Sequence, residues 1–372
     1  MAKHSYNSLQ KKYQGFIVPT HNVLINKSDK LCQDPSLHIS MIQVELTAGY
    51  EASACTLLIE DGMVVNEKKK SWEVNQTIQD LLKLGHPLEV SLGYSQEVTE
   101  VFKGIITNIQ IEYSLNQGFQ FYVEAMDVKR LMMNNYHSCQ PRKDLKKHSD
   151  AVKEILKKYA KHIDAQVVSD TEERTLAIEQ HNQSDYDFLV TLAKRVNHAF
   201  YIINNQLYFE PYGKDSNPLV ELQAEHLHAF KREISLSDQL YEVTVRANDE
   251  SDPKKSFEYT TQSCKTIGKG KKSSNDIATM MKQIAKKTII DPSISSVKEA
   301  KVRAEAELFK HTIKFAQGKF QTIGLPEITP GKMMTVKGFG ADYDNDYYIK
   351  KVLHQYDQRG FITKGELGVN KI

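Results

Sequence analysis

A helix followed directly by a hairpin, between residues 184 and 211, constrains the fold more than any other stretch of this sequence. Ser184 is suited to cap the helix, because a serine hydroxyl accepts a hydrogen bond from an orphan amide, and Asp187 follows it at capping-box spacing. Apolar residues then recur on one side of the helix: Phe188, Leu189, Leu192, Ala193 and Val196. That side must pack against another part of the chain.

The hairpin after this helix has its own local signal. The segments 199–203 and 206–209 are strand-like and flank Asn204 and Asn205, which tolerate the positive φ angles of a tight turn. Pro211 closes the second strand. A second helix is expected from Ser149, with an apolar stripe of Val152, Ile155, Leu156 and Tyr159. From these residues alone, the stretch is an α+β packing unit in which the two helices pack together.

Strand patterns dominate both ends of the chain. Strand-like runs lie between residues 13 and 60 (GFIVP, NVLI, SMIQVEL and ACTLLIE), and residues 105–113 and 119–125 alternate around a turn at 115–118. Strands return at 227–247 and at 320–367, with a Pro330-Gly331 turn between two of them. The expected fold class is therefore α+β, with two barrel-like antiparallel β regions and the helix-plus-hairpin unit between them.

Two basic stretches are predicted to be surface segments. Residues 129–148 are read as a solvated linker, because no aromatic residues interleave with the cations as base stacking would require. Residues 250–310 are read as a basic flexible insertion that ends in a helix over 296–309. Within it, residues 263–276 are predicted to be mobile, because almost no apolar residue is available there for burial. Residues 268–273 lack the spacing of a phosphate-binding loop.

Composition excludes several classes of protein. The 372 residues carry a formal charge of +2 and 40% hydrophobic residues, which fits a globular protein without general attraction to nucleic acid. No apolar run has the roughly 20 residues of a membrane-spanning helix, and the N-terminus lacks the apolar core of a secretory signal. A protein made and kept in the cytoplasm is expected. The four cysteines are widely spaced and are read as buried or idle thiols.

The sequence predicts no catalytic, cofactor-binding or metal-binding residues, and therefore no enzyme. It contains no metalloprotease, serine-hydrolase or nucleotide motif. His226 and His228 are expected to share a strand face beside Glu225, but two histidines without a third ligand are more typical of a polar strand face than of a metal site. Carboxylate pairs for glycan hydrolysis stay open, because their separation is set by the fold.

The central stretch resembles the late control protein D family, the baseplate hub of contractile phage tails, and the hub part of valine-glycine-rich spike proteins of type VI secretion. The shared pattern is Q-x-x-x-S-D-Y-D-F-L-x-x-L-A, matched here by Gln180 or Gln183, by 184–189 and by Leu192-Ala193. A second match, F-x-G-x-I followed by A-x-D, is carried by 102–106 and 125–127.

The C-terminal segment carries the third match. It follows the pattern G-x-P-x-I-x-P-G, V-x-G-x-G and Y-Y-I-x-x-V-x-H-x-Y-D from Gly324 to Asp357. The resemblance therefore touches every part of the chain in the expected order. It implies a first tube-like β-domain over 1–133, a helix-plus-hairpin domain over 134–225, and a second tube-like β-domain over 226–372 that contains the basic insertion.

The resemblance also implies a function. The two β-domains of each subunit would mimic two tail-tube subunits, so a homotrimer would adapt the hexameric tail tube to a three-fold spike. The expected partners are the tail tube protein, a separate spike or tip protein and baseplate wedge proteins, in a phage tail or tail-like particle assembled in a bacterium. A separate spike is expected because the sequence after residue 365 only completes a strand. The alternative is a cell-wall glycan hydrolase or binding module of a tail tip.

Overall fold

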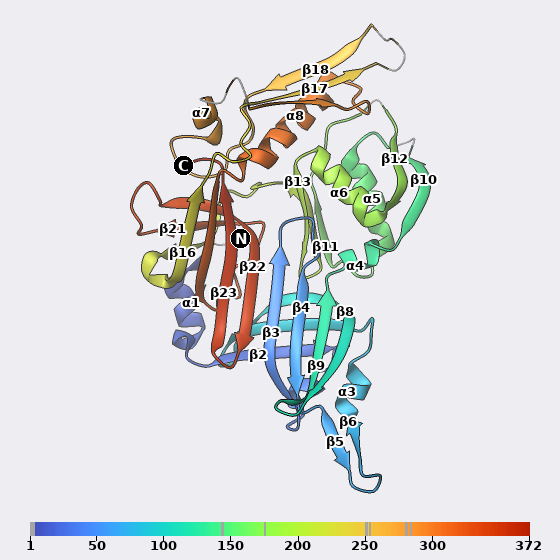
Figure 1. The fold of residues 1–372 in the computed structure, drawn as a ribbon, viewed down its shortest axis with the longest axis vertical. Coiled ribbons are helices and arrows are strands. Elements are labelled where there is room, and N and C mark those ends of the chain that lie inside the picture. The colour runs from blue at the N-terminus through green and yellow to red at the C-terminus, as the bar shows by residue number, and fades with distance from the viewer. Residues whose placement is uncertain are drawn as a thin grey trace.

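The computed structural model describes residues 4–142, 145–174, 176–249, 252, 254–279, 282 and 285–372. Among these residues, thirteen strands form one large sheet in the order β1-β15-β21-β22-β3-β4-β9-β8-β7-β2, and the row β16-β20-β23 joins it at β22 (Figure 1). Their bounds are β1 His4–Ser5, β2 Pro19–Ile25, β3 His38–Thr47, β4 Ala54–Glu60, β7 Pro87–Tyr94, β8 Glu97–Ser114, β9 Gly118–Met126, β15 Pro218–Gln223, β16 Leu227–Ile234, β20 Ala316–Ile323, β21 Met333–Lys337, β22 Asn345–Asp357 and β23 Gly360–Val369.

Smaller sheets and mostly short helices complete the described structure. The remaining strands are β5 Met63–Asn66, β6 Ser71–Val74, β10 Tyr136–Arg142, β11 Ala165–Val168, β12 Ile178–Ser184, β13 His198–Ile203, β14 Gln206–Pro211, β17 Glu242–Asn248, β18 Ser256–Thr261 and β19 Lys286–Ile290. The helices are α1 Tyr6–Lys12, η1 Gln14–Phe16, α2 Lys30–Gln33, α3 Gln76–Leu81, α4 Lys129–Met132, α5 His148–Leu156, η2 Lys157–Tyr159, α6 Asp185–Arg195, η3 Ala224–His226, α7 Ser274–Ala278 and α8 Val297–Thr312. The chain is thus mixed α+β and mostly sheet, as predicted.

One antiparallel ladder joins the N-terminal and C-terminal β regions. β3 pairs with β22 from Thr47↔Lys351 to Met41↔Asp357, so the two regions form one continuous sheet (Figure 1). The alternation of β3 explains this position, because Ile42, Val44 and Leu46 are buried on one face. The 115–118 turn joins β8 to β9 in the predicted hairpin.

The middle unit contains the helix and hairpin that the sequence predicts. The Ser184 hydroxyl accepts a hydrogen bond from the Asp187 amide at 3.0 Å, at the N-terminus of α6. Asn204 and Asn205 have φ angles of +48° and +58° in the tight turn between β13 and β14. The buried faces of α5 and α6 share one core with this hairpin. The predicted cap of α5 is wrong by two residues, because the cap position is Lys147 and Ser149 is buried inside the helix.

Residues 242–312 form a third unit, in which β17 lies almost wholly within the predicted strands 227–247 and the rest lies mostly within the predicted basic flexible insertion 250–310. β17 pairs with β18 and with β19, and α8 packs across this sheet with Ala300, Ala304 and Leu308 buried against Val243 and Val245 (Figure 1). The helix predicted over 296–309 is confirmed, and the Ser296 hydroxyl caps it. The prediction of a basic flexible insertion is wrong for β18 and β19. Exposed and partly buried residues alternate along both strands, because only one face of their sheet is covered.

The segment 263–276 is also tied to the fold. Ile267 is buried, its amide donates to Asn370 Oδ1 at 2.6 Å, and Lys272 forms two main-chain hydrogen bonds with Ile372. A further hydrogen bond holds the segment at Gly268-Lys269. The Lys269 amide donates to Asn345 Oδ1 at 2.7 Å. Segment 263–276 thus buries one of its few apolar residues and is bonded to the C-terminal residues, so its composition does not support the predicted mobility.

Two further predictions are wrong: the solvated linker over 129–148 and the strand over 15–19. The predicted linker 129–148 contains α4 and the strand β10, which pairs with β12, and Lys129 is wholly buried; residues 143–144 lie outside the described residues. The strand predicted for GFIVP (15–19) is also wrong: Gly15 and Phe16 belong to the 3-10 helix η1, where Gly15 takes a φ of +78° that a strand does not allow, and β2 begins only at Pro19.

The sheet ladders cross the predicted domain boundaries. β15 lies within the range 134–225, yet it pairs in parallel with both β1 and β21 of the large sheet. The first strand of the chain therefore lies beside C-terminal strands, and the helix-plus-hairpin unit ends before β15 begins. The boundaries 1–133, 134–225 and 226–372 stay predictions of how the chain divides into units.

Candidate assembly surface and polar cavity

Exposed apolar side chains gather at one end of the large sheet, here named the hydrophobic tip. The β5–β6 hairpin projects there, beside the turn that joins β8 to β9 (Figure 1). Rings from both hairpins touch, since the Phe119 ring centroid lies 5.4 Å from that of Trp72 and 4.7 Å from that of Tyr113. The exposed members of the tip are Val64, Val65, Trp72, Ile111, Tyr113 and Leu115.

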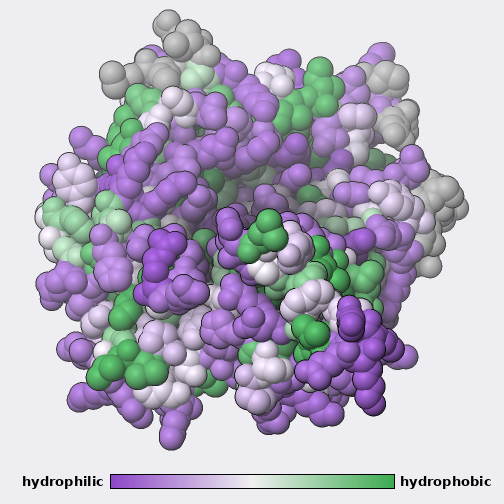
Figure 2. Space-filling model, turned by 60° about the horizontal axis from the view of Figure 1, so that its bottom comes forward, coloured by the Kyte–Doolittle hydropathy of each residue, from purple (hydrophilic) through white to green (hydrophobic). Residues whose placement is uncertain are grey.

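The hydrophobic tip has the character of a contact surface. Trp72 is 57% exposed and Leu115 is 91% exposed, and single-chain proteins rarely leave such residues clustered unless another surface covers them. Lys69 and Glu73 form an exposed ion pair at 2.8 Å beside Trp72, which gives the apolar centre a polar rim. Figure 2 turns this end toward the viewer and shows hydrophobic patches between hydrophilic side chains.

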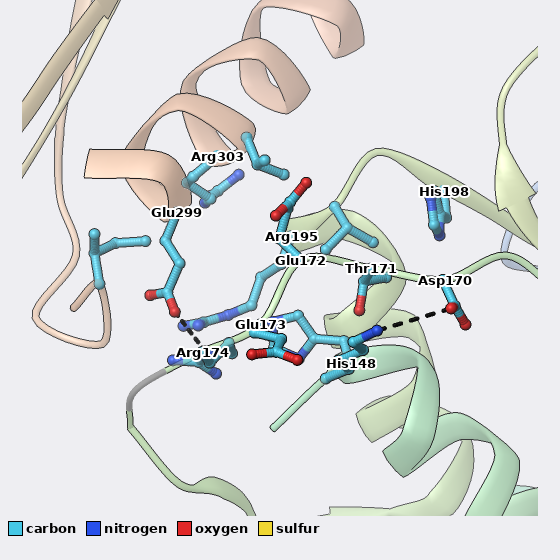
Figure 3. A pocket seen from close by; sticks show the side chains of 14 residues that line it. His148, Asp170, Thr171, Glu172, Glu173, Arg174, Arg195, His198, Glu299 and Arg303 are labelled. Atoms are coloured by element: carbon cyan, nitrogen blue, oxygen red, sulfur yellow. Dashed lines mark hydrogen bonds and ion pairs between the residues drawn. The ribbon is translucent and has the colours of Figure 1, made fainter. Parts of the chain in front are cut away.

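A polar cavity of 410 Å³ separates the middle unit from α8 (Figure 3). Arg174 and Glu299 point toward one another across it, with Nε and Oε1 3.3 Å apart and both side chains nearly buried. Arg195 from α6 lies 3.5 Å from Asp291 and donates to the Ser293 hydroxyl. These contacts join the middle unit to the third unit, because both arginines belong to the former and their partners to the latter.

Two buried histidines line the same cavity. His148 and His198 are 6% and 5% exposed, and no described residue provides a hydrogen-bond partner for either Nδ1 atom. Burial, aided by the positive charge of Arg174, lowers the pKa of His148 to about 3. Burial also lowers the pKa of His198 to about 4. Both rings are thus neutral at pH 7, unlike a general acid or base with a pKa near the working pH.

The histidines that the sequence analysis weighed as metal ligands lie elsewhere. His226 belongs to η3, stacks on Tyr6 with ring centroids 3.8 Å apart and accepts from the Gln223 amide, so it holds the N-terminal helix against the sheet. His228 is exposed on β16. Within the described ranges, no group of three or more histidine, cysteine, aspartate or glutamate side chains is arranged to hold a metal ion.

The cysteines with described side chains have different surroundings. Cys55 is buried, Cys264 is half-buried and Cys32 is exposed, and all three are free thiols. Burial raises the pKa of Cys264 to about 11, which keeps its sulfur protonated and unreactive at neutral pH. The side chain of Cys139 lies outside the described residues. Across the described part of the chain, no helix is long and apolar enough to span a membrane.

Comparison with solved structures places this fold among phage tail proteins. A tail protein from Neisseria meningitidis superposes with a TM-score of 0.69 at 12% identity, over 95% of this chain and 97% of that one. A 43 kDa tail protein of prophage MuSo2 from Shewanella oneidensis gives a TM-score of 0.64 at 12% identity, over 94% and 98%. A type VI secretion component from Escherichia coli gives 0.54 at 10% identity, over 93% and 76%. The fold is therefore that of a tail protein.

The sequence itself matches one family model, described as the Alg8 N-terminal domain, over residues 18–358. The chain belongs to this family. A comparison with curated protein sequences found no match. Because unrelated functions can share a fold, the role of this chain is argued separately from its surfaces.

Sequence reasoning missed both the hydrophobic tip and the polar cavity. Trp72, the only tryptophan of the chain, was the available signal for the tip, because an isolated aromatic residue in a charged stretch often marks a contact surface. The cavity had no local signal. Arg174 and Glu299 are 125 residues apart, and only the packing of the third unit brings them together.

Proposed function

We propose that this chain is the structural central hub of a contractile tail or tail-like injection particle, in the manner of the late control protein D family. The observation that carries the proposal is the shared fold over nearly the full length of two tail proteins. The sequence patterns of 184–193 and 324–357 support it, because they coincide with α6 and with the segment that contains β21 and β22.

In this proposal the two β regions are two tube-like barrels within one subunit. The row β3-β4-β9-β8-β7-β2 would form the first, and the strands around β22, β23, β20 and β16 the second. The β3–β22 ladder would hold the barrels side by side at a fixed angle, as two neighbouring subunits of a tube ring must be held. A homotrimer of such subunits presents six barrels and matches a hexameric tail tube to a three-fold spike.

The proposed partners are the tail tube protein, a separate spike protein and baseplate wedge proteins. The hydrophobic tip is proposed as a contact surface for one of these particle proteins, because its apolar centre and polar rim resemble a protein interface. The role is proposed to be non-enzymatic. Incubation of the purified protein with bacterial cell walls should release no glycan fragments, and release that depends on a carboxylate of this chain would instead favour the hydrolase alternative.

Stoichiometry in the assembled particle tests the proposal directly. Electron microscopy of purified particles should show three copies of this chain on the axis between the tube and the spike. Two copies or six copies at that place, or a position outside the axis, would refute the adaptor role. The particle is the appropriate sample, because the isolated hub can require its neighbours to trimerise.

A substitution pair tests the hydrophobic tip. Trp72→Ser should reduce the yield of complete particles without lowering the thermal stability of the isolated protein, because this side chain is already exposed. Ile290→Ser is the matched control, since Ile290 is 79% exposed on β19 in the third unit. Equal particle yields from both variants would show that the tip is not a contact surface.

A further inference from the structure

A second cavity, of 590 Å³, lies where three parts of the chain meet. Its walls come from the turn after β3, from the middle unit, and from α8 together with β22. Tyr50, Tyr212, Phe309 and Ile313 provide apolar surface. This cavity is hereafter the junction cavity, and it is distinct from the polar cavity of Figure 3 although Arg303 reaches both.

The junction cavity has more cations than its own carboxylates neutralise. Several of the lining cations have an ion-pair partner: Arg303 and Lys310 with Glu307, Lys314 with Asp238, and Lys351 with Glu45. Lys194 and Lys350 differ, since no carboxylate of the described residues lies within ion-pair distance of either ammonium group. The Lys194 ammonium instead lies over the Tyr50 ring, 5.2 Å from its centroid.

Lys350 is the more informative of these two lysines. It lies on β22, and burial lowers the pKa of its ammonium to about 8; the charge of Glu366 offsets this effect in part, and the nearby Lys314 adds a repulsive charge. A largely buried ammonium with no carboxylate in ion-pair contact is unfavourable, because the charge of Glu366 offsets its desolvation only in part. An anion in the cavity would give Lys350 a contacting partner, and it would also contact Lys194, whose side chain is exposed.

The walls restrict which anions fit. Aromatic and aliphatic side chains beside the lysines favour a ligand that also has an apolar body, because burial of both surfaces stabilises the complex. Glu51 and Glu366 also line the cavity and disfavour a polyanion such as a nucleic acid strand. We propose that the junction cavity binds an organic monoanion, a carboxylate or sulfonate carried on an apolar body, with the anionic group between Lys194 and Lys350.

Fluorescence titration with 8-anilinonaphthalene-1-sulfonate tests this site, because the probe joins a sulfonate to aromatic rings. We expect saturable binding of one probe molecule per chain. Lys350→Met and Lys194→Met should each weaken binding about tenfold, the loss expected for one charge-assisted contact. Lys83→Met is the matched control, since Lys83 is exposed, lies away from the cavity and removes the same charge.

Competition between small ligands separates the two halves of the proposal. Hexanoate should displace the probe, hexanol should displace it poorly because it lacks the charge, and acetate should displace it poorly because it lacks the apolar tail. Equal displacement by hexanoate and hexanol would overturn the assignment of the anionic group. Absence of saturable binding, or equal affinity in Lys350→Met, Lys194→Met and Lys83→Met, would overturn the site itself.

A stability measurement distinguishes an anion-binding role of Lys350 from a structural role. Lys350→Met replaces a largely buried cation, which no carboxylate contacts, by an apolar group of similar length, so the melting temperature should be unchanged or higher while probe affinity falls. A structural role for Lys350 would instead lower the melting temperature together with affinity, which would count against the proposal. This inference does not depend on the hub function, because the titration uses the isolated chain.

Discussion

The turn at Pro330-Gly331 provides a sharp test of how the middle unit is fixed to the C-terminal strands. Gly331 has a φ of +83° and donates its amide to the Ile349 carbonyl at 2.9 Å. A Cβ atom at this position would lie 2.3 Å from the hydroxyl oxygen of Tyr201. The Tyr201 ring has little room to retreat, since it is 1% exposed and stacks on Tyr208.

Two costs add in the variant Gly331→Ala. An alanine in the left-handed region costs about 1–2 kcal/mol. Overpacking against a buried ring costs about 1–3 kcal/mol more, because Tyr201 or the turn must shift. The expected loss is therefore about 2–5 kcal/mol of unfolding free energy. The loss should fall on the packing between β13 and the C-terminal strands.

The matched control is Gly85→Ala. Gly85 has a φ of +86°, but no atom lies within 4 Å of the position that an alanine Cβ would take there, so only the backbone cost applies. Urea unfolding followed by circular dichroism and by tyrosine fluorescence measures both variants, and agreement of the two signals justifies a single free energy. Equal losses in the two variants would refute the close packing of Tyr201 against this turn.

Three further predictions concern single side chains. Ser184→Ala should destabilise the protein by about 1 kcal/mol in urea unfolding, because the Asp187 amide loses its acceptor; retained stability would contradict the cap. Lys129→Met should cost about 1–3 kcal/mol in the same assay, because the main-chain carbonyls of 49–51 lose a shared donor, whereas a stabilised variant would contradict this role. His354 has a pKa lowered by burial to about 4 from 6.5, so the unfolded chain binds a proton that the folded chain does not, and stability should fall as pH drops from 6.5 toward 4. His354→Gln should reduce that slope without abolishing it, because the lowered pKa values of His148 and His198 contribute to the same pH dependence, and an unchanged slope would exclude a contribution from His354.

The helix caps and turns that the sequence predicted correctly are set by interactions between residues close together in the chain. The cap at Ser184, the Asn204-Asn205 turn and the 115–118 turn each depend on residues within a few positions of one another, and each is confirmed. Short-range capping and turn preferences act before any tertiary contact forms. The same holds for the helix that begins after Ser296.

The missed elements depend on partners that are distant in the sequence. β19 pairs in parallel with β17, about 40 residues earlier in the chain; β17 falls almost wholly within the predicted strands 227–247, whereas β19 was not recognisable from its own pattern of polar and apolar residues. Lys129 stands in a basic stretch that reads as solvated, yet its ammonium is buried against carbonyls about 80 residues earlier. The hydrophobic tip likewise forms only once β6 and β9 lie together. At Lys129 the charge run therefore indicated exposure where the fold buries the side chain.

The turn at 47–51 connects these observations. Lys129 Nζ donates to the carbonyls of Gly49, Tyr50 and Glu51, and the Tyr186 hydroxyl donates to the Tyr50 carbonyl at 2.7 Å. The turn that ends β3 is thus held by α4, through Lys129, and by α6, through Tyr186. Because Gly49 and Tyr50 also line the junction cavity, the contacts that fix the middle unit against the large sheet also set the shape of that cavity. An anion bound between Lys194 and Lys350 would bridge the same units, so its binding should stabilise their arrangement rather than act on either unit alone.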